Sequence, residues 1–339
     1  MDYVAGFTLG HFLDPDRTNW QATGPRPISW AIWYPADLDS PTEEQLGGAK
    51  DRPYLSNGPV SLDAAISGQQ STYPLIVMSH GTGGSALGMG WFGRRLAEKG
   101  YIVVGANHHG NTAIEPYQPE GFLCAWERSR DLSTLLDKFV RDPKYGDHID
   151  QKRIFAAGFS LGGHTVIASA GAVYANDQFL AWLADQPGVN GPREFPDLGD
   201  HVEQLMENSA PFRTSMTRDG QSYHDPRIKA VFAMAPAPTV RGFNTDSLAE
   251  ITVPIYIQTG AADQECPVES CTNWLGAQNP SFQIEILDGD VGHYIFLSEP
   301  TKYAIEDVPE ISIDPAGIDR RTIHQHAAAT ADRFFSATE

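Results

Sequence analysis

The chain has 339 residues, a formal net charge of −19 and a sequence pI near 4.9. Nucleic acid and anionic membrane surfaces repel a protein this acidic, so neither is an expected partner. Hydrophobic residues make up 41% of the chain, which is ample for a core, and no apolar stretch reaches the roughly 18 residues of a membrane span. The length fits one domain over residues 1–339 that carries insertions.

The cysteines and the first residues indicate the expected cellular location. Three cysteines are too few for a disulfide framework, and reduced thiols are expected even for Cys266 and Cys271, which are close enough in sequence to bridge. Residues Met1 to Val4 do not form a basic region followed by an apolar run, so no secretory signal is visible and we expect a cytoplasmic location. No Cys/His metal spacing occurs, so the sequence predicts no metal and no cofactor.

The N-terminal part differs from the rest in pattern. Residues 1–40 indicate a β-hairpin or meander, with turns at 14–16 and 24–25. Residues 41–73 are polar and contain several glycines, so we expect an irregular segment there.

Strand-like and helix-like runs alternate from residue 74 onward. Residues 75–78 and 102–106 are short apolar runs typical of buried strands, and 91–99 and 127–140 are typical of helices. In the last of these, apolar side chains recur at helical spacing and should cover one face of a sheet. The alternation predicts an α/β fold with a mostly parallel central sheet and helices on both faces.

The most informative stretch is residues 158–162, which read Gly-Phe-Ser-Leu-Gly and fit the G-x-S-x-G pattern. A β-compatible run at 153–157 precedes the pattern and a small-residue helical run at 163–170 follows it. This is the context of a nucleophile elbow, in which a sharp turn projects the serine hydroxyl above the sheet. We therefore predict Ser160 as a nucleophile.

A serine hydroxyl needs a histidine base, and that base needs a carboxylate to orient it. Residues 255–260 indicate a buried strand, and the loop after it offers Asp263 as the acid. The next strand-like run, 282–287, is followed by a polar loop that contains His293, the predicted base.

Several rivals compete for these two roles. His324 and His326 lie in an apparent C-terminal helix, which is a poor place for the base. Asp288 and Asp290 lie on the loop of the histidine itself and fit solvated turn residues better than the acid. Glu265 is a closer rival, because it shares the loop of Asp263.

Acyl transfer also needs N–H donors for the oxyanion. Leu161, directly after the predicted nucleophile, offers one backbone N–H. The strand at 75–78 is followed by the glycine-rich sequence 80–84, H-G-x-G-G, in which we place the second donor at Thr82, beside Gly81. A plain glycine turn is the alternative; a phosphate cradle is excluded because no lysine follows in the required spacing.

A long insertion at 174–226 is rich in turn formers and aromatic residues, and we interpret it as a cap. Loops at the carboxyl ends of strands are where such sheets bind ligands, so Trp182 and Phe212 of this insertion, with Gly81, are candidate substrate contacts. The alternative is that the aromatic residues only pack the insertion onto the body. A second insertion at 299–318 has no assigned role.

Together these pieces resemble an α/β-hydrolase of the dienelactone hydrolase-like group, and most of all the bacterial relatives of platelet-activating-factor acetylhydrolase. The matching segments extend over most of the chain: 33–36, 79–83, 96–104, 158–163, 228–231, 260–263 and 292–293. The resemblance implies Ser160 as nucleophile, Asp263 as acid and His293 as base, with an oxyanion hole at Thr82 and Leu161.

Two departures limit the resemblance. Animal acetylhydrolases of this type take the acid from one strand earlier, where residues 233–237 have no carboxylate. True dienelactone hydrolases carry a cysteine nucleophile, whereas this chain has Ser160. Bacterial polyester hydrolases also resemble the middle of the chain, through residues 91–93 and 233–238.

The expected activity is hydrolysis of small-molecule carboxylic esters through an acyl-enzyme, on short-to-medium acyl esters or dialkyl aromatic diesters. An amidase or polyester hydrolase would use the same residues, and a non-catalytic binding protein on the same scaffold is a further alternative. The net charge disfavours long anionic substrates, although a local basic patch from Arg94, Arg95 or Arg128 could reverse this. The oligomeric state is open.

Overall fold

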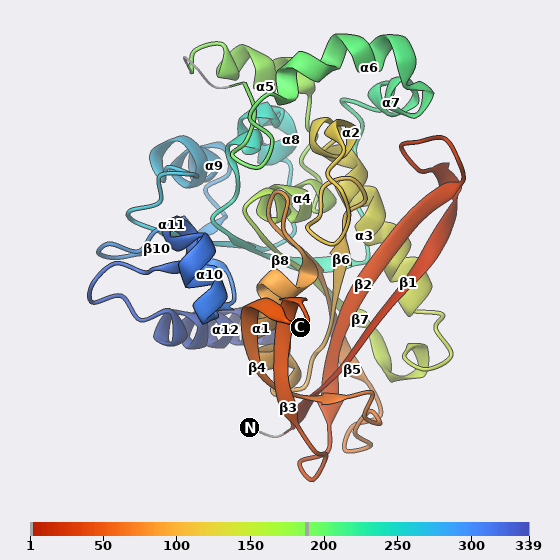
Figure 1. Cartoon of the computed structure of the whole chain (residues 1–339), viewed down its shortest axis with the longest axis vertical. Coiled ribbons are helices and arrows are strands. Elements are labelled where there is room, and N and C mark those ends of the chain that lie inside the picture. Colours follow the sequence, from red (N-terminus) through yellow and green to blue (C-terminus); the bar gives the residue numbers. More distant parts are fainter. Residues whose placement is uncertain (1–2, 187–189, 339) are drawn as a thin grey trace.

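A computed structural model describes residues 3–186 and 190–338. One twisted sheet runs through the whole molecule, as Figure 1 shows. Its strands are β1 (Val4–Thr18), β2 (Pro25–Ala36), β3 (Glu43–Ala49), β4 (Arg52–Leu62), β5 (Tyr73–Ser79), β6 (Ile102–Asn107), β7 (Ile149–Phe159), β8 (Ile228–Met234), β9 (Ile255–Gly260), β10 (Gln283–Leu287) and β11 (Glu299–Pro300).

The strands are ordered β10-β9-β8-β7-β5-β6-β2-β1-β4-β11, and β3 pairs with β4 beside this path. All neighbours from β10 to β6 are parallel. The chain moves from β5 to β6 on one side and then returns to β7 on the other, so the strand order reverses around β5. In open α/β sheets the carboxyl ends of the strands at such a reversal form the usual binding crevice.

Helices connect the strands and cover the sheet. They are α1 (Gly90–Ala97), α2 (Pro119–Leu123), α3 (Trp126–Phe139), α4 (Leu161–Ser169), α5 (Asn176–Leu183), α6 (Val202–Asn208), α7 (Ala210–Met216), α8 (Thr245–Ala249), α9 (Trp274–Gln278), α10 (Lys302–Asp307), α11 (Pro309–Ser312) and α12 (Arg320–Ser336).

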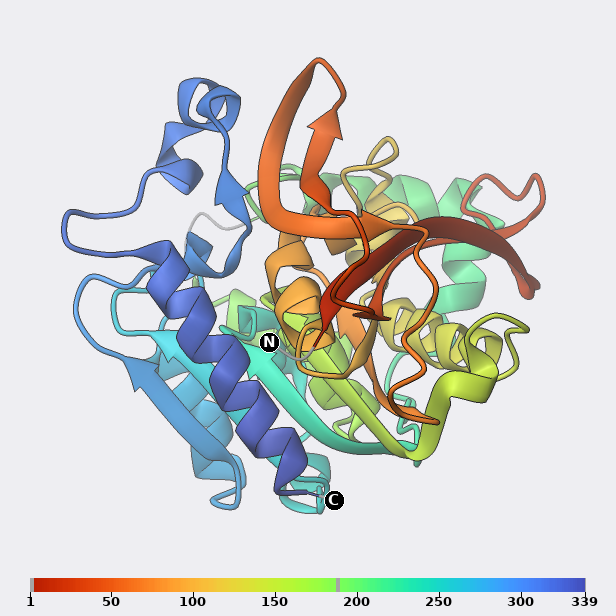
Figure 2. The same ribbon diagram turned by 90° about the horizontal axis from the view of Figure 1, so that it is seen from below.

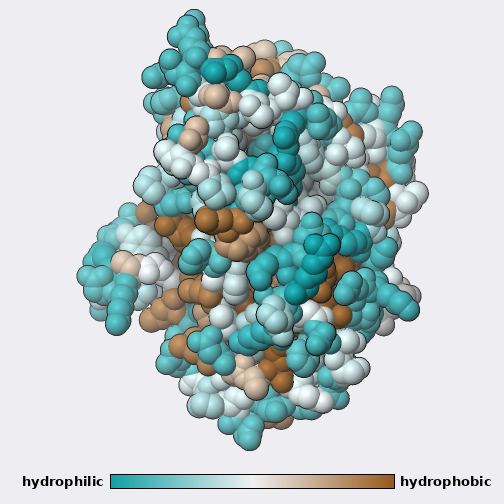
Figure 3. All heavy atoms as spheres, turned by 90° about the vertical axis from the view of Figure 1, so that its right-hand side faces the viewer, coloured by the Kyte–Doolittle hydropathy of each residue, from teal (hydrophilic) through white to brown (hydrophobic). Residues whose placement is uncertain are grey.

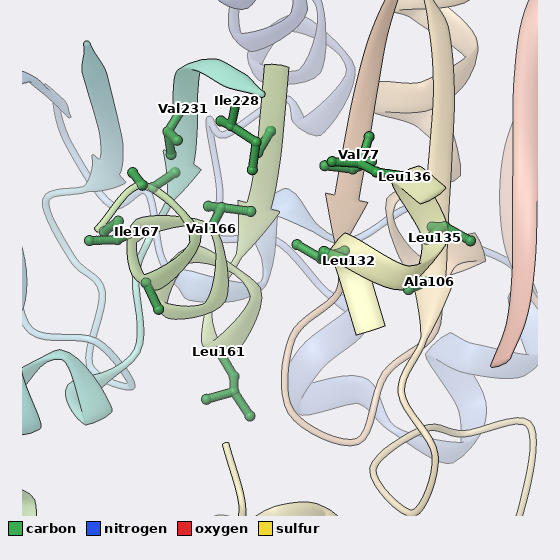
Figure 4. Close-up of a cluster of buried hydrophobic side chains, with 14 of the residues drawn as sticks. Val77, Ala106, Leu132, Leu135, Leu136, Leu161, Val166, Ile167, Ile228 and Val231 are labelled. Carbon is green, nitrogen blue, oxygen red and sulfur yellow. The ribbon is translucent and has the colours of Figure 1, made fainter. Parts of the chain in front are cut away.

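Side chains of the central strands alternate between two cores, because successive residues of a strand point to opposite faces. Leu75 and Val77 of β5 belong to the core under α3 and α4, where Figure 4 shows Val77 close to Leu132 and Leu136 of α3. Ile76 of β5 belongs to the other core, which α1 and α12 cover. Figure 2 shows α12 lying across the strands on that side. These layers hold the carboxyl ends of β5 and β7 in a fixed position.

The N-terminal hairpin predicted for residues 1–40 is present as the antiparallel pair β1 and β2. The prediction of an irregular segment at 41–73 is wrong, because β3 and β4 lie within it. Their pairing contains irregularities between Glu44 and Leu46 and between Gly47 and Gly48. These irregularities accommodate the glycine and proline residues that hide the strands in the sequence.

The two insertions fold separately onto the sheet. Between α4 and β8, the predicted cap contains α5, α6 and α7 together with a short turn, η3 (Leu198–His201). It lies beyond the carboxyl ends of the strands, at the top of Figure 1. The second insertion contains β11, α10 and α11, and β11 pairs with the distant β4.

The surface is mostly hydrophilic and the three cysteines are unpaired, as the composition of the chain predicts. Figure 3 shows one face of the molecule, where hydrophilic residues predominate and hydrophobic residues lie in small groups. Within residues 3–186 and 190–338, no helix is both long and apolar enough to cross a membrane. Cys124, Cys266 and Cys271 are free and buried.

Candidate active site

Ser160 lies at the sharp turn between β7 and α4. Its backbone has φ 56° and ψ −120°, a conformation that residues other than glycine rarely adopt. The N–H of Ser160 donates to the carbonyl of Met234 at 2.9 Å, and its carbonyl accepts from the N–H of Ala237 at 3.0 Å. These two bonds to the end of β8 hold the strained turn in place.

The two glycines that flank this turn allow three backbones to approach each other. A methyl group on Gly158 would lie 2.1 Å from the carbonyl oxygen of Gly162, and one on Gly162 would lie 1.9 Å from the carbonyl oxygen of Ser79. Any side chain at either position would overlap backbone atoms. The pattern G-x-S-x-G therefore follows from the close contact of β5, β7 and α4.

Asp263 and His293 reach Ser160 from the ends of two neighbouring strands. Asp263 follows β9, and His293 follows β10 as the first residue of a short turn, η6 (His293–Phe296). His293 Nε2 lies 3.1 Å from Ser160 Oγ, and His293 Nδ1 lies 2.8 Å from Asp263 Oδ2. The exposed fraction is 7% for Ser160, 5% for Asp263 and 7% for His293, so water has little access to these hydrogen bonds.

Each contact in this row has a chemical consequence. A carboxylate only accepts hydrogen bonds, so Asp263 favours the tautomer that carries its proton on Nδ1 and leaves the Nε2 lone pair facing the serine. The other oxygen of Asp263 accepts the N–H of Cys266 at 2.7 Å, which fixes the carboxylate. The ring of His293 packs 4.7 Å from that of Phe159. This geometry can move a proton between the serine hydroxyl and the imidazole.

Two backbone N–H groups near the nucleophile turn have no acceptor among the residues that the structure describes. Leu161 is the first residue of α4, so its N–H has no acceptor inside the helix. In the loop after β5, the N–H of Gly83 donates to Asn111 at 2.6 Å and that of Gly84 to Gly81 at 3.2 Å. The N–H of Thr82 has no acceptor in the described part of the chain.

Gly81 also belongs to this loop and approaches the nucleophile closely. A methyl group there would lie 3.2 Å from Ser160 Cβ. The roles of Thr82, Leu161 and Gly81 stay predictions.

The rival residues lie elsewhere. His324 is buried against Trp91 at 3.7 Å between ring centroids, and its Nε2–H donates to the carbonyl of Ile295 at 2.8 Å. His326 pairs with Glu285 at 2.6 Å on the surface. Three acidic rivals are exposed on loops: Glu265, Asp288 and Asp290.

The sequence indicates Arg128 only as a possible part of a basic patch, whereas the structure buries it beside this site. It lies on α3, is 1% exposed, and donates to the carbonyl of His80 and to Thr165 Oγ1, the latter at 3.2 Å. Thr165 in turn donates to the carbonyl of Leu161 at 2.8 Å. Arg128 thus connects the loop of Thr82 to the start of α4, the two places that carry the free N–H groups. Its acceptors are far away in the sequence, so no local pattern reveals this role.

Behind Arg128 lies a buried cluster of charges. Asp131 accepts from Arg26 at 2.9 Å, forms an ion pair with Arg17 at 2.7 Å and contacts His108 Nδ1 at 2.9 Å. Burial opposes ionisation of Asp131, but the two arginines outweigh it and hold its pKa well below the ordinary value. Burial and the nearby Arg128 lower the pKa of His108 to about 3, so this ring is neutral at pH 7. His108 Nε2 meets Ser79 Oγ at 2.9 Å and so links the cluster to β5.

Cys266 is the other residue that the sequence did not assign to the site. Its Sγ lies 3.9 Å from His293 Nε2. Burial, followed by the charge of Asp263, raises the pKa of this thiol well above its ordinary value, so it is a poor nucleophile. Asp263, Cys266 and His293 place metal-ligand atoms within 4.8 Å of one another. Because Asp263 and His293 Nδ1 already bind each other, only the thiol and Nε2 would face a metal, fewer than the ligands of a zinc site.

The cap reaches over the site through residues 192–195. Glu194 packs against Gly83, and Tyr117 donates to the carbonyl of Gly83 at 2.7 Å. Burial, followed by the like charge of Glu265, raises the pKa of Glu194. Arg193 forms an ion pair with Glu310 of α11, so the second insertion supports this cap segment.

The two predicted cap contacts differ in position. Trp182 lies on α5, is partly exposed and stacks 5.9 Å from Phe179. Phe212 on α7 is 1% exposed and packs in the core shared with α3 and α4. Their roles in substrate binding stay predictions.

A strand, a strained serine turn and a helix, at the carboxyl edge of a doubly wound sheet, define the architecture of α/β hydrolases. The family model described as "Alpha/beta hydrolase family" matches residues 76–306. The chain therefore belongs to the alpha/beta hydrolase family, and the predicted fold class is confirmed.

Curated relatives match a short region. Cutinase 2 of Thermobifida cellulosilytica is 29% identical over 97 residues, which are 28% of this chain and 33% of the cutinase. Dipeptidyl-peptidase 5 of Porphyromonas gingivalis is 32% identical over 96 residues, which are 28% of this chain and 13% of the peptidase. The chain thus matches about a third or less of the length of these relatives.

Among solved structures, the ferulic acid esterase of Streptomyces cinnamoneus superposes with a TM-score of 0.61. The superposition covers 100% of this chain and 91% of the esterase at 16% identity. This likeness shows a common fold.

Proposed function

We propose that the protein is a serine carboxylic-ester hydrolase that acts through an acyl-enzyme. The observation that carries the proposal is the continuous row of hydrogen bonds from Ser160 Oγ through His293 to Asp263, at 3.1 and 2.8 Å. The similarity to cutinases and to a ferulic acid esterase supports ester hydrolysis as the reaction.

The reaction has two halves. Ser160 Oγ attacks the ester carbonyl while His293 Nε2 takes the hydroxyl proton, and the N–H groups of Thr82 and Leu161 bind the oxyanion. His293 gives the proton to the leaving alkoxide, and the alcohol departs from the acyl-enzyme. Water then attacks the acyl carbon with His293 as base again, which frees the carboxylic acid and restores Ser160. Asp263 stabilises the imidazolium in both halves.

The cap favours small substrates. Ser160 is only 7% exposed, and residues 192–195 lie over the loop of Thr82. A polymer surface could not reach such a serine unless the cap moved, which disfavours a polyester hydrolase. We propose short-to-medium acyl esters or dialkyl aromatic diesters as substrates, within the dienelactone hydrolase-like group and near the platelet-activating-factor acetylhydrolase relatives. The match to a dipeptidyl-peptidase favours an amidase as the second candidate.

The test is hydrolysis of p-nitrophenyl esters from acetate to palmitate by the wild type and by Ser160→Ala, with matched p-nitroanilides alongside. We expect the wild type to cleave short and medium esters and Ser160→Ala to lose at least about a thousandfold in kcat, because the remaining groups cannot form the acyl-enzyme. Cleavage of anilides in preference to esters would favour the amidase. Equal activity in Ser160→Ala would refute the serine mechanism.

A further inference from the structure

Arg241 lies between the cap and the body of the protein. It belongs to a short turn, η4 (Pro238–Gly242), that follows β8. Its guanidinium carbon lies 4.7 Å from the ring centroid of Trp274, at the start of α9, and 5.8 Å from that of Trp182 on α5. Two indole rings, one from the cap and one from the body, therefore border this cation.

This cation has no anionic partner within the described residues. Arg241 forms no ion pair and no side-chain hydrogen bond there, and its Nε is buried without an acceptor. Thr239 Oγ1, on the same turn, is also buried without a partner. Burial lowers the pKa of Arg241, and no carboxylate offsets that cost. Buried polar atoms normally have hydrogen-bond partners, so this turn presents two atoms, Arg241 Nε and Thr239 Oγ1, whose bonding capacity a ligand can use.

The contrast with the other arginines near the site is informative. Arg193 pairs with Glu310, and Arg94 pairs with Glu98. Arg128 and Arg95 also have one buried nitrogen each without a partner in the part of the chain that the structure describes, but Arg128 is 1% exposed and Arg95 lies on α1, on the other face of the sheet from α4. In a chain with 43 acidic and 24 basic residues, an arginine that faces no acid is available to a ligand.

The turn that carries Arg241 is attached directly to the nucleophile turn. Ala237 donates to the carbonyl of Ser160 at 3.0 Å, and η4 begins at the next residue. A 3₁₀ turn rises about 2 Å per residue, so the backbone of Arg241 lies within roughly 8 Å of Ala237. One short backbone segment therefore carries both a hydrogen bond to the nucleophile turn and Arg241.

We propose that Arg241 is an anion subsite that binds a carboxylate of the substrate, so that monoesters of dicarboxylic acids are the preferred substrates. The inference rests on the proposed ester hydrolase function and names its substrate class. The planar guanidinium can hold a carboxylate through two parallel hydrogen bonds. The neighbouring rings of Trp182 and Trp274 restrict the orientation of this guanidinium. Such a local cation overcomes the repulsion that the net charge of −19 exerts on anionic esters.

The kinetic test compares each monomethyl ester with its dimethyl ester, for adipic acid and for benzene-1,4-dicarboxylic acid. The wild type is expected to have the higher kcat/KM on the monoesters. Arg241→Gln should lower the monoester-to-diester ratio by about tenfold or more, since a charge-assisted pair is lost, and Arg241→Lys should lower it less. Arg213→Gln is the control, because it removes an exposed cap cation whose hydrogen bonds are to the carbonyls of Met206 and Glu207, and it should change the ratio less than about twofold.

A binding test is independent of turnover. Calorimetric titration of monomethyl adipate into Ser160→Ala and into the double variant Ser160→Ala/Arg241→Gln should show affinity about tenfold weaker in the double variant. Equal affinities, or a monoester-to-diester ratio that Arg241→Gln leaves unchanged, would overturn the anion subsite. If the wild type cleaved neither ester, the proposed function would fail while the binding test still decided the role of Arg241. Thermal unfolding checks that each variant is folded. If Arg241→Gln does not fold, weaker binding of the monoester by Arg241→Lys, and weaker binding by the wild type at high salt, test the anion subsite instead.

Discussion

At the scale of single residues, the chemistry depends on how one imidazole is held. A free histidine would rotate and exchange tautomers, but the carboxylate on Nδ1 and the ring of Phe159 leave His293 one orientation. The lone pair of Nε2 then faces Ser160 at all times, and the imidazolium that forms during reaction has a counter-charge in place.

Asp263→Asn tests the acid. The amide would have to donate toward Nδ1 or lose its hydrogen bond, so the imidazole would adopt the wrong tautomer. We expect kcat to fall by about 10³- to 10⁴-fold with a small change in KM. Steady-state kinetics on a p-nitrophenyl ester gives both values, and Glu265→Gln, an exposed neighbour on the same loop, is the matched control. A larger loss in Glu265→Gln than in Asp263→Asn would reverse the assignment.

Arg128→Lys tests the connection between the two N–H groups of the predicted oxyanion hole. Lysine keeps the charge but cannot reach the carbonyl of His80 and Thr165 together. We expect kcat to fall by about tenfold or more while KM stays nearly constant, because a misplaced donor weakens the transition state most. Arg130→Lys, on the same helix, is the control. An equal loss in both variants would contradict the positioning role.

Ser160, Asp263 and His293 could be predicted from the sequence because each follows a recognisable strand, and the ends of parallel strands meet at one edge. The sequence indicates Arg128 only as part of a basic patch and does not place Cys266 beside the base. The acceptors of Arg128 are 37 and 48 residues away, and Cys266 meets a histidine 27 residues away. Such contacts follow from tertiary packing, which leaves no local pattern.

At the scale of elements, the elbow depends on how closely α4 approaches β5. Gly162→Ala would place a methyl group 1.9 Å from the carbonyl oxygen of Ser79. We expect a loss of about 1–3 kcal/mol in the free energy of unfolding, measured by urea denaturation, with reduced kcat. Gly68→Ala is the control, since its new methyl group would meet nothing within 4 Å. Equal stability of the two variants would show that the turn relaxes freely.

The elements that the sequence predicted well are those whose pattern is local. The hairpin at 1–40 and the helix at 127–140 have clear periodicity, and both appear in the structure. Strands β3 and β4 were missed because β4 contains Pro53 and Pro59 and pairs with β1 and β11, which lie far from it in the sequence. The separate helices of the cap carry no periodic signal long enough to predict them.

At the scale of the whole molecule, buried neutral histidines connect the fold to pH. Burial is the largest cause that lowers the pKa of His80, His108, His164 and His324, to about 3 for His108 and His164. In the unfolded chain each of these histidines takes up a proton near pH 6.5. In the folded chain the same histidines stay neutral until a much lower pH. Stability is therefore complete above about pH 6.5 and falls as the pH decreases toward 3.

His164→Phe isolates one of these groups. His164 is buried and stacks 4.5 Å from Phe243, so a phenyl ring fits its surroundings. Between pH 6 and pH 4, we expect the free energy of unfolding to fall less steeply in this variant, by about 1.4 kcal/mol per pH unit. Urea denaturation at several pH values measures the slope. His224→Phe, at an exposed histidine, is the control; an unchanged slope in His164→Phe would contradict the account.

The most direct test of the proposed hydrolase is covalent trapping with a fluorophosphonate, followed by intact mass measurement and peptide mapping. We expect one equivalent of label on Ser160 in the wild type, none in Ser160→Ala, and slower labelling in Asp263→Asn. Labelling of another residue, or equal labelling of Ser160→Ala, would contradict the claim that Ser160 is the nucleophile of this protein.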